Sequence, residues 1–203
     1  MCGVVNIYTL SPLRYQGIKV RAEYGSRNAI RAGASAYFKP QAGLGASVSA
    51  QFTHNDGYFR NSYDNSLLDK QNCGDIRTKF QWRKNFLSID NTLALSVLSQ
   101  QGYPYAYMGA IDSSKEANEA LIGSICYNDP SSYDRIALTE VVTARPDWEK
   151  ITLTSITSYQ YLNDRMVMDQ DFLPQSYFTL EQAKQQHDIS EDIIIRSRTS
   201  NRY

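Results

Sequence analysis

The residues that could bind a metal ion are few and widely spaced. Asp169 and Asp171 flank a single glutamine, and their carboxylate oxygens are the ligand type that a hard cation prefers. A Ca²⁺ ion takes about six to eight oxygen ligands, and the other acidic residues of a calcium loop do not accompany this pair. The two histidines, His54 and His187, lie far apart and lack ligand-type neighbours. We therefore predict no metal site and expect Asp169 and Asp171 to lie in a solvated loop.

No group of residues predicts nucleophilic or redox catalysis. The cysteines, Cys2, Cys73 and Cys126, show no CxxC or CxxH spacing, so neither a zinc site nor a thioredoxin-type site is indicated. The sequence has no GxSxG or HExxH motif and no phosphate-binding glycine loop. Its Gly43-Leu44-Gly45 is typical of a turn that leads into a strand. We therefore predict that the protein is not an enzyme, has no catalytic residues and needs no cofactor.

The composition excludes several classes of protein. The 203 residues hold 21 Lys and Arg against 21 Asp and Glu, so a zero net charge gives no electrostatic reason to expect nucleic acid as a partner. With 42% hydrophobic and 21% charged residues, the chain is too apolar for intrinsic disorder. A transmembrane helix needs about 20 mostly apolar residues, and the longest candidate, Asn91 to Ile111, is interrupted by Gln100 and Pro104. Met1 to Thr9 lacks the basic region of a signal peptide, and we expect that the true beginning of the protein is missing.

Alternation of apolar and polar residues with a period of two is the clearest pattern in the chain. It predicts strands with two different faces, as in the segment Ile18 to Tyr24. The 15 tyrosines also favour strands. We expect eight strands, at residues 18–24, 29–39, 44–54, 76–82, 86–98, 134–144, 150–161 and 189–199. The predicted fold class is all-β, with no long helix, although Thr179 to Gln186 could form one or two helical turns.

The connections between these strands alternate between short and long. Short ones are expected at residues 40–43, 84–85 and 145–149, long ones at 55–74, 99–133 and 162–188, and the tight turn at 25–28 is the exception. Outer-membrane barrels have short periplasmic turns and longer extracellular loops, and each strand crosses the bilayer with about 9–11 residues. A soluble antiparallel domain would show the same alternation, but it gives no reason for this sorting of the loops.

Several segments, in order and spacing, resemble a TonB-dependent outer-membrane receptor. The segment Gly3 to Thr9, followed by Pro12 and Gly17, is similar to the end of the family's plug domain leading into the first barrel strand. The family's pattern is also matched by Tyr24-Gly25-Ser26, Asp56-Gly57-Tyr58 with Asn61, Asp75 to Trp82, Thr154 to Tyr159, Asp169 to Phe172 and Ile189 to Glu191. Cys2 departs from the pattern, because the family usually has a small residue at that position.

The resemblance implies residues 1–14 as the C-terminal end of the plug domain and residues 15–203 as the N-terminal part of a transmembrane β-barrel. The fold would be an antiparallel meander of about eight strands from a larger plugged barrel. The implied function is energised uptake of a scarce solute, such as a ferric siderophore, across the outer membrane of a Gram-negative bacterium. The implied partners are the TonB energy transducer, acting through a missing N-terminal segment, the iron–siderophore or a similar small solute, and outer-membrane lipid. The alternative is a complete, small eight-stranded outer-membrane barrel with a structural or adhesive role.

The resemblance also gives expectations for the polar face of the strands. Two basic rows, Lys19 with Arg21 and Arg77 with Lys79 and Arg83, would face the lumen of a barrel. There they would pair with plug carboxylates or guide an anionic solute. No particular residue is predicted to bind the solute.

The long loops carry many tyrosines and two of the cysteines. The tyrosines would stack on a ligand or pack the loops together; they are Tyr58, Tyr63, Tyr103, Tyr105, Tyr107, Tyr127 and Tyr133. Cys73 and Cys126 would lie in consecutive outer loops, where an oxidising compartment would permit a disulfide. A disulfide and two free thiols both stay open at this point.

Overall fold

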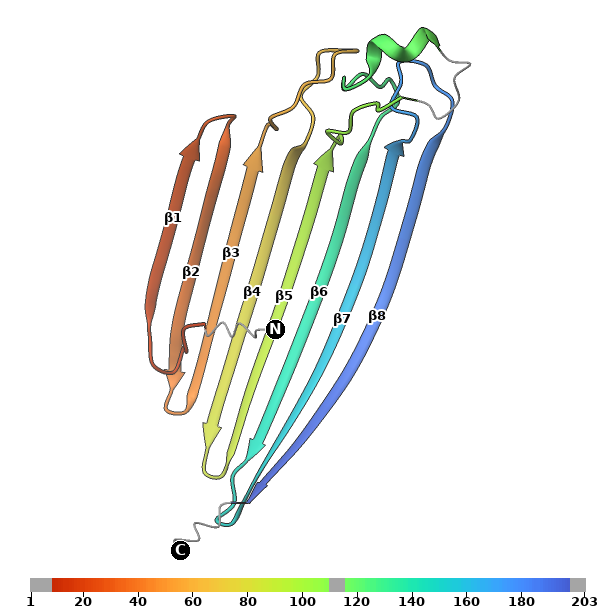
Figure 1. Cartoon of the computed structure of the whole chain (residues 1–203). Helices are drawn as coiled ribbons and strands as arrows, with labels where there is room; N and C mark the ends of the chain where they lie inside the picture. The colour runs from red at the N-terminus through yellow and green to blue at the C-terminus, as the bar shows by residue number, and fades with distance from the viewer. Residues whose placement is uncertain (1–8, 110–115, 198–203) are drawn as a thin grey trace, which may run out of the picture.

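Eight antiparallel strands form one sheet in which each strand pairs with its neighbours in the sequence (Figure 1). The structure, a computed structural model, describes residues 9–109 and 116–197. The strands are β1 (Gly17–Gly25), β2 (Ala29–Gln41), β3 (Leu44–Asn55), β4 (Lys70–Lys84), β5 (Leu87–Gln101), β6 (Ser132–Pro146), β7 (Ile151–Asp169) and β8 (Thr179–Ser197), and a short 3₁₀ helix, η1 (Glu116–Leu121), lies between β5 and β6. No helix within the described ranges is both long and apolar enough to cross a membrane. The predicted all-β meander is confirmed.

β4 and β7 extend further toward the long loops than the alternation predicted. β4 begins at Lys70 rather than at Ile76, and β7 continues past Tyr161 to Asp169. The added residues of β4 pair with β3 on one side and β5 on the other. Cys73 therefore lies in a strand, and its expected place in an outer loop is wrong.

The start of β8 corrects the expectation of a helix. Residues 179–186 are strand, not helical turns. They are paired along their whole length with the last part of β7, from Thr179 opposite Asp169 to Gln186 opposite Leu162. The segment shows no apolar alternation, so its strand conformation comes from pairing with β7 rather than from a pattern in its own sequence.

The long connections gather at one end of the sheet and most short turns at the other (Figure 1). The loop end carries residues 56–69, 102–131 and 170–178 with the tight turn 26–28, and the turn end carries 42–43, 85–86 and 147–150. In the tight turn, Arg27 and Asn28 have φ angles of 61° and 50°. Positive φ at both central residues is typical of a type I′ hairpin turn. The predicted sorting of loops is confirmed.

The sheet has one apolar face and one polar face, because side chains alternate between faces along every strand. Cross-strand pairing from β1 to β6 aligns one apolar row, Val20, Ala34, Ala50, Ile76, Leu95 and Leu138. The adjacent row, on the opposite face, is Arg21, Gly33, Gln51, Asp75, Ser96 and Ala137. The two-faced strands predicted from the alternation are present in β1 to β6.

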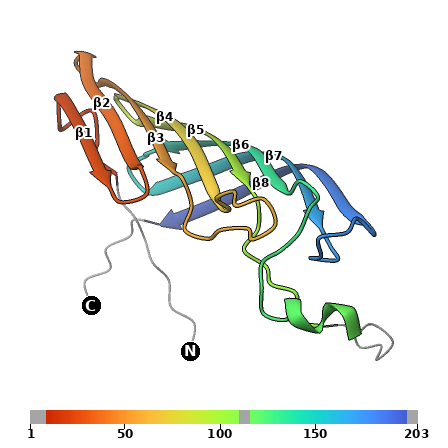
Figure 2. The same ribbon diagram turned by 90° about the horizontal axis from the view of Figure 1, so that it is seen from above.

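The described sheet is a single layer without a core on either face, as the view from its loop end shows (Figure 2). Most buried apolar side chains instead belong to the loop end, where Leu68, Tyr107, Tyr127 and Leu173 are each less than 9% exposed. On the apolar face, large side chains such as Ile18 and Ile189 remain up to 77% exposed. The apolar face is therefore left uncovered by the described residues.

The sheet is open within the part of the chain that the structure describes. β1 pairs with β2 alone, and β8 pairs with β7 alone. A closed eight-stranded barrel would require β1 to pair with β8. The architecture is consistent with part of a larger barrel.

Candidate functional site

The segment before β1 lies on the polar face of the sheet. Residues 9–16 reach across β3 to β4, where the Lys79 ammonium donates a hydrogen bond to the Thr9 hydroxyl over 3.1 Å. The Ser11 hydroxyl donates to the Gln81 side-chain oxygen on the same strand. The polar face thus carries polypeptide at its turn end, on the side where the resemblance expected the plug.

Glycine at position 45 allows this contact. A Cβ atom at Gly45 would lie 2.9 Å from the backbone of both Pro12 and Leu13, closer than real Cβ contacts come. Pro12 is less than 2% exposed at this point. The segment therefore sits directly on the backbone of β3.

Replacing Gly45 with alanine is expected to displace residues 9–16 from the sheet. Trypsin should then cleave the bond after Arg14 roughly tenfold faster or more, because loss of about 1.4 kcal/mol of contact raises the open population tenfold. The measurement is the rate of this cleavage at low protease concentration. Gly74→Ala is the matched control, because a Cβ there meets nothing within 4 Å. Equal cleavage rates in the two variants would refute the described contact.

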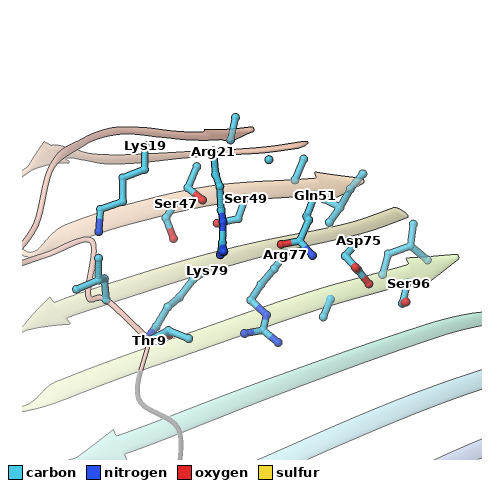
Figure 3. A pocket seen from close by; sticks show the side chains of 18 of the residues that line it. Thr9, Lys19, Arg21, Ser47, Ser49, Gln51, Asp75, Arg77, Lys79 and Ser96 are labelled. Atoms are coloured by element: carbon cyan, nitrogen blue, oxygen red, sulfur yellow. The ribbon is translucent and has the colours of Figure 1, made fainter. Parts of the chain in front are cut away.

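Next to this segment is a groove of about 800 Å³ on the polar face. Its floor consists of small side chains on β2 and β3, including Gly33, Ser35 and Ser49. Figure 3 shows Arg21 extending from β1 across the strand that carries Ser49, with Arg77 on the same side of the sheet. The small floor residues give the groove its depth, and long basic side chains form its walls.

Three of the basic side chains in the groove already have partners. Arg21 and Arg31 share the Glu23 carboxylate, at 2.6 Å from Arg21 Nε and 3.3 Å from Arg31 Nη1. The Lys19 ammonium lies 4.9 Å from the centre of the Tyr15 ring, a cation–π distance. These pairs hold the β1 wall of the groove in place.

The basic side chains on the β4 wall of the groove differ in their partners. Among the described residues, no carboxylate lies within ion-pair distance of the Arg77 guanidinium or the Lys79 ammonium. Asp75 lies two residues away on the same face of β4. The two predicted basic rows therefore meet across one groove, and on its β4 side both Arg77 and Lys79 lack a described carboxylate partner.

Arg83, the third residue of the predicted row, has a structural role. Its guanidinium binds both oxygens of Asp90 on β5, at 2.9 and 2.8 Å. The Gln81 amide donates to the same carboxylate over 2.6 Å, and Arg145 approaches it at 3.4 Å. Among the described residues, Arg83 thus pairs with Asp90 on the neighbouring strand rather than with the plug carboxylate that the resemblance implied. The alternation alone did not single out Asp90 as its partner.

At the opposite end of the sheet, the long loops bind one another. Asn61 is 3% exposed, and its side-chain amide donates to the Tyr127 carbonyl over 2.7 Å. The Ser62 amide donates to the Ile125 carbonyl over 2.9 Å. The loops after β3 and β5 are therefore fixed together by hydrogen bonds.

The predicted loop tyrosines divide into two groups. Tyr107 and Tyr127 are buried and pack the loops together, whereas Tyr58, Tyr63 and Tyr105 are 49–59% exposed. The exposed Tyr105 ring stacks on Tyr103 with centroids 5.6 Å apart and meets Phe172 edge-on at 5.8 Å. Tyr133, expected in a loop, lies in β6 instead.

Burial favours the neutral form of the inner phenols even more strongly than water does. It raises the pKa of Tyr103 to about 12 and also raises the pKa of Tyr127. The Tyr127 hydroxyl donates to the Tyr103 carbonyl and accepts from the Tyr103 amide, both at 3.1 Å. At neutral pH this pair therefore acts as a neutral hydrogen-bonded brace within the loop after β5.

The acidic pair at the end of β7 organises a loop. Asp169, 1% exposed, accepts hydrogen bonds from the amides of Asp129 and Phe172 at 3.1 and 2.9 Å. Asp171 accepts from three backbone amides, those of Leu173, Tyr177 and Phe178. Asp169 is therefore buried rather than solvated, and within the described ranges no group of three metal-ligating residues gathers around the pair.

The remaining candidate residues lie apart from the groove. Cys73 in β4 and Cys126 in the loop after β5 are free thiols, so the disulfide left open by the sequence is not formed. His54 contacts Asn72 and Asp56, at 2.7 and 3.1 Å, near the loop end of the sheet. His187 contacts the Tyr159 hydroxyl on the apolar face at 2.9 Å, which leaves the two histidines on different strands.

Comparison with known proteins adds no relative. No family model, no curated protein and no solved structure matches the chain. The proposed function therefore rests on the sheet, its two faces and the groove.

Proposed function

We propose that the chain forms the end of the plug and the first eight strands of a TonB-dependent outer-membrane receptor, which imports a scarce solute such as a ferric siderophore. The observation that carries the proposal is the uncovered apolar face. Ile18, Val20 and Ile189 on this face are 76–77% exposed. Large apolar side chains in such numbers are stable against lipid, whereas in water they would favour association.

The apolar residues form a belt that crosses the strands obliquely. At the level of Val20 on β1, the pairing register places Tyr161 on β7 and His187 on β8. The apolar residues of β8, such as Ile193 and Ile195, lie further toward the turn end. Barrel strands are tilted by about 35–45°, so a belt parallel to the membrane must cross them at an angle.

Several polar side chains on the apolar face are hydrogen-bonded to each other. The Asn91 amide donates to the Glu140 carboxylate over 2.9 Å. The Glu191 carboxylate accepts from the hydroxyls of Ser155, at 2.7 Å, and Thr157. Lipid tails offer no hydrogen bonds, so a polar side chain that faces lipid must find its hydrogen-bond partners within the sheet.

The polar face would line the lumen. Residues 9–16 lie on it, where the end of a plug would join the barrel. Import in this class of receptor is driven by TonB from the inner membrane, so the polypeptide needs to bind and release its solute but not to perform chemistry. The open edges of β1 and β8 would pair with the remaining strands of a barrel of about 22 strands.

Reading the DNA on both sides of the reading frame tests this proposal. We expect the frame to continue upstream into a plug with a signal peptide and downstream into roughly a dozen or more alternating strands. Start and stop codons bounding residues 1 and 203 would overturn the receptor assignment. Heat-modifiable gel migration after refolding in detergent would then favour a complete small barrel, and a detergent-free soluble monomer would favour a soluble β-domain.

A further inference from the structure

We propose that the groove on the polar face binds a small solute that carries two or more carboxylate groups. The inference rests on the proposed function for the groove's place in an import path, whereas the binding itself depends only on the groove. The groove carries an excess of positive charge. The basic side chains in and around the groove are Lys19, Arg21, Arg31, Arg77 and Lys79, and the acidic ones are Glu23 and Asp75.

The positive charges that β4 contributes to the groove have no described carboxylate within ion-pair distance. Glu23 is occupied by two arginines of the β1 and β2 wall, so it cannot neutralise the opposite side. Arg77 and Lys79 follow each other on one face of the strand, with Cα atoms about 7 Å apart. Two cationic head groups at this spacing suit two carboxylates of one molecule better than a single anion.

Arg77 is open to a ligand on both sides. Its cross-strand neighbours on the polar face are Ser49 on β3 and Ala94 on β5, both small. A guanidinium binds a carboxylate through two parallel hydrogen bonds, which fixes the orientation of the ligand. Hydroxyls on the groove floor, from Ser35 and Ser49, can donate further hydrogen bonds.

The size of the groove and the neighbouring chain favour a small solute as the occupant. A volume of about 800 Å³ lies within the usual range of small-molecule sites, about 300–1,000 Å³. The described polypeptide next to the groove, residues 9–16, contains no Asp or Glu. The segment adjacent to the groove therefore has no carboxylate with which to neutralise Arg77 and Lys79.

The test measures binding of benzene-1,3,5-tricarboxylate and benzoate by equilibrium dialysis, with the full chain refolded in nonionic micelles. We expect saturable binding of the tricarboxylate, and binding of the monocarboxylate at least roughly tenfold weaker, because each additional ion pair in a half-exposed site adds up to about 1 kcal/mol. The double variant R77Q/K79Q should weaken tricarboxylate binding about tenfold. Raising the salt concentration to 0.5 M should also weaken it, because these charges are accessible to screening ions.

The matched control is K150Q/K184Q, which removes the same charge from a turn and from β8, outside the groove. The control should bind the tricarboxylate as the parent chain does. Equal weakening in both double variants, or equal binding of the two ligands, would overturn the proposal. So would binding of a Glu-Gly-Glu-Gly-Glu peptide that the tricarboxylate fails to displace, because the occupant would then be polypeptide. The proposed function has a separate readout in the flanking reading frame, so failure of one is distinguishable from failure of the other.

Discussion

Leu95→Arg will reduce partitioning of the chain into neutral phosphatidylcholine vesicles by roughly 30-fold or more. Leu95 lies in the middle of β5, within the apolar row that runs from Val20 to Leu138. An arginine at the lipid face near the midplane of a barrel costs about 2–4 kcal/mol. Vesicles without net charge are chosen so that the added positive charge gains no attraction to the lipid surface. Tryptophan fluorescence of Trp82 and Trp148 during vesicle titration gives the partition coefficient.

Ser96→Arg is the matched control, one residue along the same strand. Ser96 points to the polar face and lies directly opposite Asp75, so an arginine there remains in water and gains a carboxylate neighbour. We expect its partitioning to stay within about twofold of the parent chain, because an exposed ion pair is worth at most about 1 kcal/mol. Similar losses in the two variants, or no loss in either, would show that the apolar face does not contact lipid.

The fold was predictable for the strands that have one apolar face and one polar face. From β1 to β5, residues such as Val20 and Ile76 alternate with Arg21 and Arg77, and this pattern determined both the strands and their faces. β8 lacks the pattern in its first ten residues, because Gln182, Lys184 and their neighbours are polar on both faces. Only pairing with β7 makes this segment a strand, and such pairing is a long-range contact that local periodicity does not encode.

The groove was partly predictable. The rows containing Lys19 and Arg77 could be assigned to one face from spacing alone. Their approach across the sheet depends on the register that places Ser49 opposite both Ser35 and Arg77, and a shift of one residue would reverse every face. The loop contacts were less predictable still, since the bond from Asn61 to Tyr127 joins residues 66 positions apart in irregular segments.

Gly57→Ala will destabilise the loop end of the sheet by about 2–4 kcal/mol, the second large effect that the structure implies. Gly57 has a φ of 86°, which alanine adopts only with strain. A Cβ there would also lie 1.7 Å from the Leu68 carbonyl oxygen, so the backbone of this loop at Leu68 must move. Leu68 is 4% exposed, and a Cβ on Gly102 would come within 2.8 Å of its side chain. The displacement would therefore pass from the loop after β3 to the loop after β5.

Hydrogen exchange of the loop amides measures this effect at its source. In the loop after β3 the Leu68 amide donates to the Phe59 carbonyl over 2.8 Å, and in the loop after β5 the Gly102 amide donates to the Ser131 carbonyl over 2.7 Å, so both should exchange at least roughly 30-fold faster in Gly57→Ala. Gly74→Ala, whose Cβ meets nothing within 4 Å, should leave both rates within a few-fold of the parent chain. Amides in the middle of β4 and β5 should be unchanged in either variant, because their bonds lie within the paired sheet. Faster exchange confined to the loop after β3 would contradict the interlocking of the two loops, whereas faster exchange in both would show that the loop layer opens as one unit.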